Sequence, residues 1–266
     1  MSASAPFAVE AKHITNRFGS QLVHDRLDFS VRQGEIVGIV GGSGAGKTVL
    51  LRTLLGLNAP VSGEVRIFGK PIAALAPREK AASIGVLFQQ GALFSSMSVA
   101  QNVMMPLAEY TDLTEEERRE IAAMKIELAG LSSEAGLKMP AQLSGGMVKR
   151  ASLARALALD PRILFLDEPT SDLDTLTAAS IDALIRKLNA SLGVTVVIVT
   201  HDPNTLVSTC DRIAVLSDHK IIMGTLDELL DSKDEWTHDF FHNPRAQGAI
   251  LAGRAQQPQE APHGNR

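Results

Sequence analysis

The sequence predicts an α/β fold with a mostly parallel sheet, because short apolar runs alternate with helical patterns along most of the chain. Several of these runs are nearly continuous in Val, Ile and Leu, which is typical of strands covered on both faces. The expected strands are EIVGIVG at 35–41, SIGVLF at 83–88, ILFLD at 163–167, TVVIVT at 195–200 and RIAVLS at 212–217. The expected helices cover 47–57, 144–159 and 178–191.

Two segments depart from this alternation. The early runs AVEAKHITNRF, LDFSVR and EVRIFG predict a small antiparallel β subdomain beside the main sheet. Strand signals then stop between about residues 90 and 160, where TEEERREIAAMKIELAGL begins with a capping-box pattern from Thr114 to Glu117. We therefore expect a helical subdomain over about 90–160, inserted into the α/β core.

The length of 266 residues is enough for one large domain, which we expect to span residues 7–235. Residues 236–266 are expected to form a C-terminal extension, which holds the aromatic cluster WTHDFFHNPR and then becomes rich in Gln, Pro and Gly. Its last dozen residues are expected to be disordered. The segment FFHNPRA could pack on a neighbouring chain or fold back on its own domain.

Composition excludes several classes of protein. A net charge of −4 and a pI near 6.0 give no electrostatic footprint for nucleic acid, so no nucleic-acid partner is expected. The single cysteine, Cys210, cannot form an intramolecular disulfide, which fits a reducing cytosol. The N-terminus lacks the pattern of a secretion signal, and the apolar runs are shorter than the roughly 18–20 residues that span a bilayer. We expect the chain not to cross a membrane by itself, so that any membrane role depends on a partner.

The segment GGSGAGKT at 41–48 matches the phosphate-binding pattern G-x-x-x-x-G-K-[ST] between an expected strand and an expected helix. In such a loop backbone N–H groups cradle the phosphates, Lys47 supplies a point charge and the Thr48 hydroxyl can bind Mg²⁺. The alternative is a glycine-rich turn without a ligand. The residues expected to bind the phosphates are Gly41, Gly42, Ser43, Gly44, Ala45, Gly46, Lys47, Thr48 and Val49.

Two adjacent carboxylates, Asp167 and Glu168, end the expected strand in ILFLDEPT. Each needs solvent or a cation, because burying an unpaired charge is costly. A Mg²⁺ ion held by Asp167, directly or through water, would leave Glu168 free to polarise a water for attack on a γ-phosphate. The alternative is a strand that ends in solvated acids.

Two further strand ends carry polar side chains. TVVIVTHD delivers His201, which could hydrogen-bond a γ-phosphate or orient the attacking water, although a lone histidine is usually structural. Gln89 follows SIGVLF and could sense the nucleotide through Mg²⁺ or the water. The expected catalytic residues are thus Glu168, His201 and Lys47, and the expected Mg²⁺ ligands are Thr48, Gln89 and Asp167.

QLSGGM at 142–147 offers a second anion site, because Ser144, Gly145 and Gly146 expose backbone N–H groups at a helix start. One triphosphate needs a single cradle, so a second is redundant within one chain. If two chains pair head to tail, each Ser144 could close over phosphates held by the Lys47 of the other chain, and two nucleotides would be sandwiched. The alternative is a helix N-cap without a ligand.

Taken together, the motifs resemble the nucleotide-binding subunit of ABC transporters over roughly residues 7–230. They correspond to a Walker A loop (GGSGAGKT), a Q-loop (Gln89), a signature (LSGGM), a Walker B strand (ILFLDE), a D-loop (SDLD, with Asp174) and a switch histidine (His201). Phe18 stands where that family places an aromatic residue against adenine. The resemblance implies a P-loop NTPase fold of ABC type and an ATPase that uses ATP and Mg²⁺, with Phe18 and Asp174 also at the ATP site.

Three segments resemble one branch of that family more narrowly: FQQGALFSSMSVAQNVMMPLAEYT, LSGGMVKRASLARALALDP and FFHNPRA look like the ATPase subunit of Mla-type systems, also called toluene-tolerance or Mce-associated systems. The resemblance implies a homodimer under two permease subunits at the cytoplasmic face of the bacterial inner membrane. It also implies phospholipid transport between the inner and outer membranes, a periplasmic Mce-domain partner and often a STAS-domain partner. The alternatives are an importer of another solute, a soluble ABC ATPase of DNA repair or translation, and a non-catalytic regulatory module.

Met147 departs from the commoner LSGGQ of the family. Methionine cannot donate the amide hydrogen bonds of glutamine, so any such contact is lost or replaced by packing. The phosphate contacts are expected from Ser144 and the backbone, so ATP hydrolysis should survive the change. Leu93, Phe94 and Met97 follow the Q-loop, where the family docks its permease, and could serve that purpose or fill the core of the helical subdomain.

Overall fold

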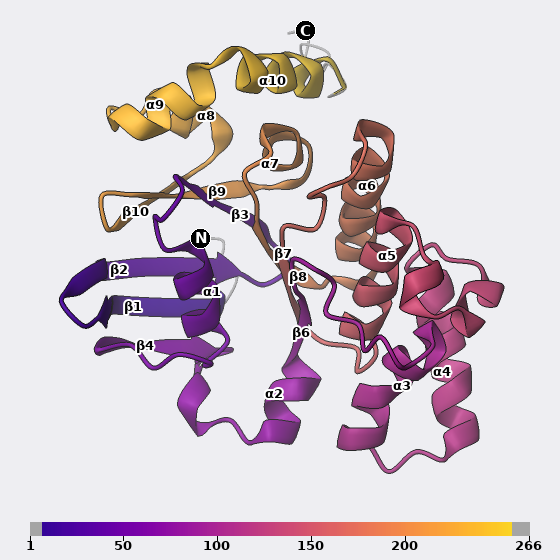
Figure 1. Ribbon diagram of the computed structural model, residues 1–266. Coiled ribbons are helices and arrows are strands. Elements are labelled where there is room, and N and C mark those ends of the chain that lie inside the picture. The colour runs from indigo at the N-terminus through magenta and orange to yellow at the C-terminus, as the bar shows by residue number, and fades with distance from the viewer. Residues whose placement is uncertain (1–6, 257–266) are drawn as a thin grey trace, which may run out of the picture.

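The computed structural model describes residues 7–256 and confirms the predicted fold class (Figure 1). The main sheet has six strands in the order β10-β9-β3-β8-β7-β6, and only β10 runs antiparallel to its neighbour. These strands are β3 (Ile36–Gly41), β6 (Ile84–Leu87), β7 (Ile163–Asp167), β8 (Thr195–Val199), β9 (Arg212–Ser217) and β10 (Lys220–Gly224). Every residue of β3 and β8 is buried, which explains their continuous apolar sequences.

The predicted antiparallel sheet is also present, in the order β2-β1-β4-β5. Its strands are β1 (Phe7–Phe18), β2 (Gln21–Arg32), β4 (Ser62–Ile67) and β5 (Lys70–Pro71). Helix α1 (Lys47–Leu54) lies between this sheet and the parallel one, and one buried cluster that includes Phe29, Leu50 and Phe165 joins all three. The phosphate loop at the start of α1 is therefore positioned by both sheets.

The helical subdomain contains α3 (Val99–Tyr110), α4 (Glu115–Leu128) and α5 (Gly145–Ala156), with 3₁₀ turns at Ser133–Leu137 and Pro140–Gln142. Figure 1 shows these helices on the side of the parallel sheet opposite the antiparallel one. The predicted capping box starts α4, where Thr114 Oγ1 accepts from the Glu117 N–H at 3.3 Å and Glu117 Oε2 accepts from the Thr114 N–H at 2.7 Å. The subdomain has its own apolar core of alanine, valine and leucine side chains.

The remaining helices cover the parallel sheet and its edges. They are α2 (Pro77–Ser83), α6 (Thr175–Leu192), α7 (Pro203–Thr209), α8 (Leu226–Leu230), α9 (Glu235–His242) and α10 (Pro244–Gln256), with a 3₁₀ turn at Ile72–Ala74. None of the helices in the described part of the chain has the length and apolarity needed to cross a membrane.

The segment FFHNPRA folds back on its own domain. Phe241 of α9 is fully buried and shares a cluster with Val40, Leu206 and Ile213 of the same chain. Helix α10 packs against α7, and both α9 and α10 lie at one end of the molecule in Figure 1. The expected disorder of the last dozen residues concerns positions outside the described range, except for 255 and 256, which end α10.

Candidate nucleotide-binding site

The phosphate loop connects β3 to α1 and needs glycine at two positions for conformational reasons. Gly44 and Gly46 have φ values of +79° and +96°, a left-handed region that disfavours side chains. A Cβ atom on Gly46 would also lie 2.5 Å from Cγ1 of Val23 and 2.6 Å from Nε2 of His24. The loop therefore presses directly on β2, and no larger residue fits at its end.

The same loop leaves donors free for an anion. Gly46 is the N-cap of helix α1 and has no side chain, so the first N–H groups of the helix have no partner from a capping side chain. The side chain of Lys47 lies back over the loop, where Nζ donates to the carbonyl oxygens of Gly41 at 2.7 Å and Gly42 at 3.0 Å. Burial lowers the pKa of Lys47, while the carboxylates of Glu168 and Asp167 raise it. These groups are suited to the phosphates of a nucleotide.

Asp167 ends β7 near three cations and a second carboxylate. Burial raises the pKa of Asp167, and the neighbouring charge of Glu168 raises it further, against the influence of Lys149, Arg52 and Lys47. A bound cation would reverse that effect by stabilising the ionised form. The side chains proposed from the sequence as Mg²⁺ ligands offer a hydroxyl, an amide oxygen and a carboxylate, which are the hard oxygen donors that Mg²⁺ prefers.

The donor set fits Mg²⁺ better than a metal that needs an all-protein cage. Within residues 7–256 no group of three or more His, Cys, Asp or Glu side chains is arranged to hold a metal ion. Mg²⁺ commonly keeps several waters and binds through one or two protein carboxylates and substrate phosphates. Thr48 and Gln89 are exposed, so both can reach such an ion at the protein surface.

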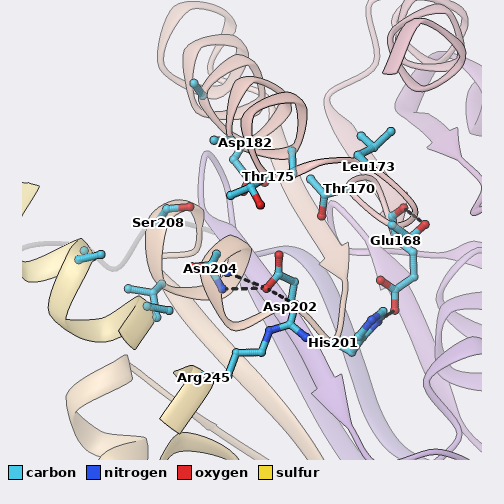
Figure 2. A pocket seen from close by; sticks show the side chains of 18 of the residues that line it. Glu168, Thr170, Leu173, Thr175, Asp182, His201, Asp202, Asn204, Ser208 and Arg245 are labelled. Carbon is cyan, nitrogen blue, oxygen red and sulfur yellow. Dashed lines mark hydrogen bonds and ion pairs between the residues drawn. The ribbon is translucent and has the colours of Figure 1, made fainter. Parts of the chain in front are cut away.

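Glu168 and His201 lie together, as Figure 2 shows. The Nδ1 atom of His201 is 2.8 Å from Oε1 of Glu168. The glutamate side chain is only 12% exposed, whereas the histidine side chain is 64% exposed, so the pair spans the boundary between interior and solvent. Glu168 has a φ of +48°, and its N–H donates to the Val199 carbonyl of β8 at 2.8 Å. A non-glycine residue held in this region is uncommon and is typical of functional sites.

A cavity of about 470 Å³ extends from this pair. Its wall continues along the D-loop to α6, α7 and α10, and includes the Asp202–Arg245 ion pair at 3.4 Å (Figure 2). The Glu168–His201 pair is therefore bordered by the helices that follow β7 and β8, and by α10 of the C-terminal extension.

The signature starts α5, where Ser144 is the N-cap and its Oγ accepts from the Met147 N–H at 3.3 Å. Ser144 and Gly145 are exposed, but Gly146 is buried, and a Cβ atom there would lie 2.5 Å from Cγ2 of Thr177. The second glycine is thus required by the packing of α5 against α6, in addition to any contact with an anion. Met147 packs on the core of the helical subdomain.

Two other candidate residues lie at exposed turns. Asp174 is the N-cap of α6 and accepts from the N–H groups of Leu176 at 3.1 Å and Thr177 at 3.0 Å, and from Thr177 Oγ1 at 2.6 Å. These hydrogen bonds lower the pKa of Asp174, so the carboxylate is ionised. Phe18 ends β1 and is 53% exposed, which leaves its ring accessible for stacking.

Two polar residues near the site were not predicted from the sequence. Lys149 is buried on α5, and its ammonium contacts the segments after β6 and β7. The sequence held one indication of this role, because Lys149 is four residues before Leu153 and so lies on the same side of the helix. A charged residue on a buried helix face needs polar partners.

His24 is the second, and it is fully buried under the phosphate loop. Its Nδ1 lies 2.9 Å from Asn16 Oδ1, Asn16 donates to Thr53 Oγ1 at 3.2 Å, and Thr53 donates to the Val49 carbonyl at 2.8 Å. Because each group in this chain donates to the next, the proton of His24 is on Nδ1 and its Nε2 faces Gly46 without a partner among the described residues.

Comparisons with known proteins identify the family. The model of the family described as ABC transporter matches residues 24–171. The chain is 41% identical over 230 residues to the intermembrane phospholipid transport system ATP-binding protein MlaF of Haemophilus influenzae, covering 85% of this chain and 87% of that protein. It is 42% identical over 224 residues to the methionine import ATP-binding protein MetN of Brucella abortus, covering 83% of this chain and 60% of that protein.

A further relative and a solved structure agree with this assignment. The probable ribonucleotide transport ATP-binding protein mkl of Mycobacterium leprae is 38% identical over 242 residues, covering 90% of this chain and 70% of that protein. The dimeric structure of the ATP-binding cassette MJ0796 in a post-hydrolysis state, bound to ADP and Pi, matches with a TM-score of 0.74 and 34% identity, covering 82% of this chain and 98% of that chain. The chain therefore belongs to the ABC transporter family, in which it is an ATP-hydrolysing subunit.

Proposed function

We propose that this ABC transporter ATPase subunit powers the movement of phospholipid between the inner and outer membranes of a bacterium. The observation that carries the proposal is the similarity to MlaF, which extends over 87% of that protein, whereas the match to MetN covers only 60% of MetN. The methionine of LSGGM also supports phospholipid transport, because it stands where most of the family has glutamine and the Mla branch looks similar in carrying methionine there.

The phosphates of ATP are proposed to bind over the loop at 41–49, with Lys47 turning from the carbonyls of Gly41 and Gly42 to the β- and γ-phosphates. Thr48, Gln89 and Asp167 would hold Mg²⁺, which neutralises charge on the phosphates when bound. The ring of Phe18 would stack on adenine. The positive charge of Lys47 and the donors at the start of α1 support this arrangement.

Glu168 is proposed to orient the water that attacks the γ-phosphorus. A bond forms between the water oxygen and phosphorus, the bond to the β-γ bridging oxygen breaks, and Glu168 accepts a proton from the water. His201 holds the carboxylate through the 2.8 Å contact, and its other ring nitrogen would hydrogen-bond the γ-phosphate. The position of Glu168 supports this role, because its side chain is only 12% exposed and lies at the boundary between interior and solvent.

Each ATP site is proposed to need a second copy of the chain. Ser144 is exposed at the start of α5, and Figure 1 shows α5 on the far side of the sheet from α1 and its phosphate loop. A head-to-tail homodimer would bring Ser144 and Gly145 of one copy, and the exposed D-loop with Asp174, to the nucleotide of the other. The dimeric state of the MJ0796 cassette supports this arrangement.

Permease subunits are proposed to dock in a groove of about 650 Å³ between the edge strand β6 and the helical subdomain. Phe88 and Phe94 line it and are 40% and 45% exposed, whereas Leu93 packs on the core of the subdomain. The groove adjoins Gln89, so a movement of the helical subdomain on ATP binding would reach the permease. This docking would hold the chain at the cytoplasmic face of the inner membrane.

The other proposed partners are a periplasmic Mce-domain protein and a STAS-domain protein, on the similarity to MlaF alone. We further propose that residues 7–235 form the ATPase domain and that 236–266 form an extension. No nucleic-acid partner is proposed, because the chain is acidic overall.

The second candidate function is import of another solute, which the match to the methionine import protein MetN favours. The match to the probable ribonucleotide transport protein mkl also points to a solute other than phospholipid. The test is purification of the complex from native membranes, followed by mass spectrometry of its subunits and its bound small molecules. An Mce-domain subunit with bound phospholipid is the expected result. A solute-binding protein with an amino acid or nucleoside, and no enriched lipid, would reject the phospholipid proposal and leave the ATPase assignment intact.

A further inference from the structure

Lys149 of α5 is a buried lysine whose three ammonium hydrogens are all used within the protein. The residue is only 6% exposed. Its Nζ donates to the carbonyl oxygen of Gln89 at 2.5 Å, to the carbonyl oxygen of Glu168 at 2.7 Å and to Oγ of Ser171 at 3.1 Å. Since an ammonium has three donors, this set of contacts is complete.

Each of these acceptors belongs to a different part of the ATP site. Gln89 follows β6, Glu168 follows β7, and Ser171 begins the D-loop, while Lys149 itself lies five residues after Ser144 of the signature. The segments of Gln89, Lys149 and Glu168 are far apart in the sequence, whereas Ser171 follows Glu168 by three residues. The Lys149 side chain is therefore the point at which four motifs of the site are joined.

The contact with Glu168 bears on the geometry of the proposed base. Glu168 has a φ of +48°, which a non-glycine residue keeps only when its surroundings hold it there. Its carbonyl oxygen accepts from Lys149 Nζ, from Ser171 Oγ at 3.0 Å and from the Ser171 N–H at 3.3 Å. These three donors fix the main chain of Glu168, the residue whose side chain contacts His201.

The contact with Gln89 continues along the same face of α5. Ser152 Oγ donates to the Gly91 carbonyl at 3.0 Å, and the guanidinium of Arg155 donates to Gly91 at 2.9 Å and Ala92 at 2.6 Å. Lys149, Ser152 and Arg155 are spaced three residues apart, so they share one side of the helix. Movement of α5 must therefore carry the segment 89–92 with it.

A second buried lysine gives a comparison. Lys125 is 4% exposed, and its ammonium contacts the carboxylate of Asp160, so it ties α4 to the end of the signature helix without touching the ATP site. Lys149 differs because none of its three partners is a carboxylate oxygen. Burial lowers the pKa of Lys149, and the charges of Asp172, Glu168 and Asp167 only partly oppose this. Its hydrogen bonds therefore hold two backbone carbonyls and a hydroxyl in place and do not form an ion pair.

We propose that Lys149 is a positioning residue for ATP hydrolysis, which holds the main chain of Glu168, the Gln89 segment and the D-loop in register with the signature helix of the same chain. The inference rests on the proposed role of Glu168 as the base. Because α5 also presents Ser144 to the partner copy, the lysine links the base of one ATP site to the signature that completes the other. It concerns the ATPase cycle and holds for any transported solute.

The test compares full-length Lys149→Met, Ser171→Ala, the double variant and Lys125→Met with the unmodified protein. ATP affinity is measured through the emission of Trp236, the single tryptophan, whose Nε1 lies 3.2 Å from where a Cβ of Gly42 would stand. We expect Lys149→Met to bind ATP within about twofold of the unmodified affinity but to lose about 10- to 100-fold in kcat, as for residues that orient a reactive group. Lys125→Met should keep both values, because its lysine lies outside the site.

The double variant separates positioning from general stability. If Lys149 acts through the Ser171–Glu168 contacts, Lys149→Met/Ser171→Ala should lose little more turnover than Lys149→Met alone. Unchanged kcat in Lys149→Met, or a loss of ATP affinity as large as the loss of turnover, would overturn the inference. Should Lys149→Met not fold, Ser171→Ala decides: lower kcat with unchanged affinity supports the proposal, and unmodified kcat overturns it.

Glu168→Gln is assayed in parallel to keep the two proposals apart. An inactive Glu168→Gln together with a fully active Lys149→Met would reject the positioning role alone. A fully active Glu168→Gln would instead reject Glu168 as the base, whatever Lys149→Met does.

Discussion

The Oε1 atom of Glu168 lies 2.8 Å from the Nδ1 atom of His201, although the two residues are 33 positions apart in the chain. They meet because β7 and β8 are adjacent parallel strands, paired from Ile163 and Thr195 onward, so both end at the same edge of the sheet. The pair also lies within the electrostatic reach of Lys47, where burial lowers the pKa of the lysine and the charge of Glu168 partly opposes that lowering. Four predictions follow from this geometry and from the buried groups around it.

Glu168→Gln should leave ATP binding intact and remove most of the turnover. The amide keeps the shape of the side chain but cannot accept a proton from water, and loss of a general base typically costs about 10²–10⁴-fold in rate. Steady-state ATPase assays and equilibrium ATP binding check this, with Glu120→Gln on the exposed face of α4 as the control. Turnover at the unmodified level would exclude Glu168 as the base.

Ser144→Arg should inactivate the nucleotide site of the partner copy. The larger cation occupies the exposed helix start that is proposed to close over the phosphates held by the other chain. In a mixed dimer of Ser144→Arg and Lys47→Ala chains, one site keeps both an intact loop and an intact signature only if each site takes its loop from one chain and its signature from the other. A composite site therefore predicts that one of the two sites carries both defects and the other is intact, with about half of the activity if the sites work independently.

The control for that experiment is Ser133→Arg, at an exposed position of the helical subdomain. Dimers of Ser144→Arg alone should be inactive, and Ser133→Arg dimers should be fully active. Full activity of Ser144→Arg dimers would count against the composite site.

Acid should destabilise the fold through His24. Burial lowers the pKa of His24 to about 4 from 6.5, so the unfolded chain binds a proton between these values that the folded chain does not. The contribution of the neutral histidine to the free energy of unfolding is therefore complete above pH 6.5, and it is lost as the pH falls toward 4. The loss between pH 7 and pH 5 should be about 2 kcal/mol.

Urea unfolding at pH 7 and pH 5 measures this change. In His24→Gln the difference between the two pH values should shrink by that amount, whereas in His242→Gln, on an exposed face of α9, it should not. An equal pH dependence in the two variants would show that His24 does not titrate as its burial implies.

Asp182→Asn should stabilise the protein at alkaline pH. Asp182 on α6 is buried, accepts from Thr205 Oγ1 at 3.1 Å and has no partner for Oδ1 among the described residues. Burial raises the pKa of Asp182 to about 7, so the folded chain keeps a proton that the unfolded chain has lost above about pH 4. The buried carboxyl group therefore lowers the free energy of unfolding, and this loss grows as the pH rises from 3.8 to about 7.

The expected gain for Asp182→Asn at pH 8 is about 2–4 kcal/mol, and it should vanish at about pH 3, where the carboxyl group is mostly neutral in both states. Thermal or urea unfolding at the two pH values measures it. Asp239→Asn, at an exposed position of α9, provides the control. A stability gain that is the same at both pH values would mean that the charge is not its cause.

Local sequence was sufficient for much of the fold and for the candidate residues. The phosphate loop, the two carboxylates after β7 and the helix caps at Thr114 and Ser144 are each encoded by neighbouring residues, so a short pattern identifies them. The strands β3 and β8 were predictable because burial on both faces requires continuous apolar runs.

Other features depend on which segments meet. Strand β2 begins at Gln21, six residues before the predicted run at Leu27. The sequence pattern missed these six residues because the buried His24 interrupts the apolar alternation. Strand β10 was not predicted, since it lies at the sheet edge and only Gly224 within it is buried. The aromatic extension could have packed on another chain, and only the assembled core shows Phe241 inside its own domain.

The sequence by itself thus determined the α/β class, the nucleotide loop and the strand ends that carry Asp167, Glu168 and His201. Only the tertiary structure decided that Lys149 reaches Glu168 and Gln89 and that Gly146 is needed against Thr177. The physical reason is that secondary structure follows from the periodicity of nearby residues. The partner of a buried charge, or the room for a Cβ atom, is instead set by segments that approach one another only when the sheet and helices have packed.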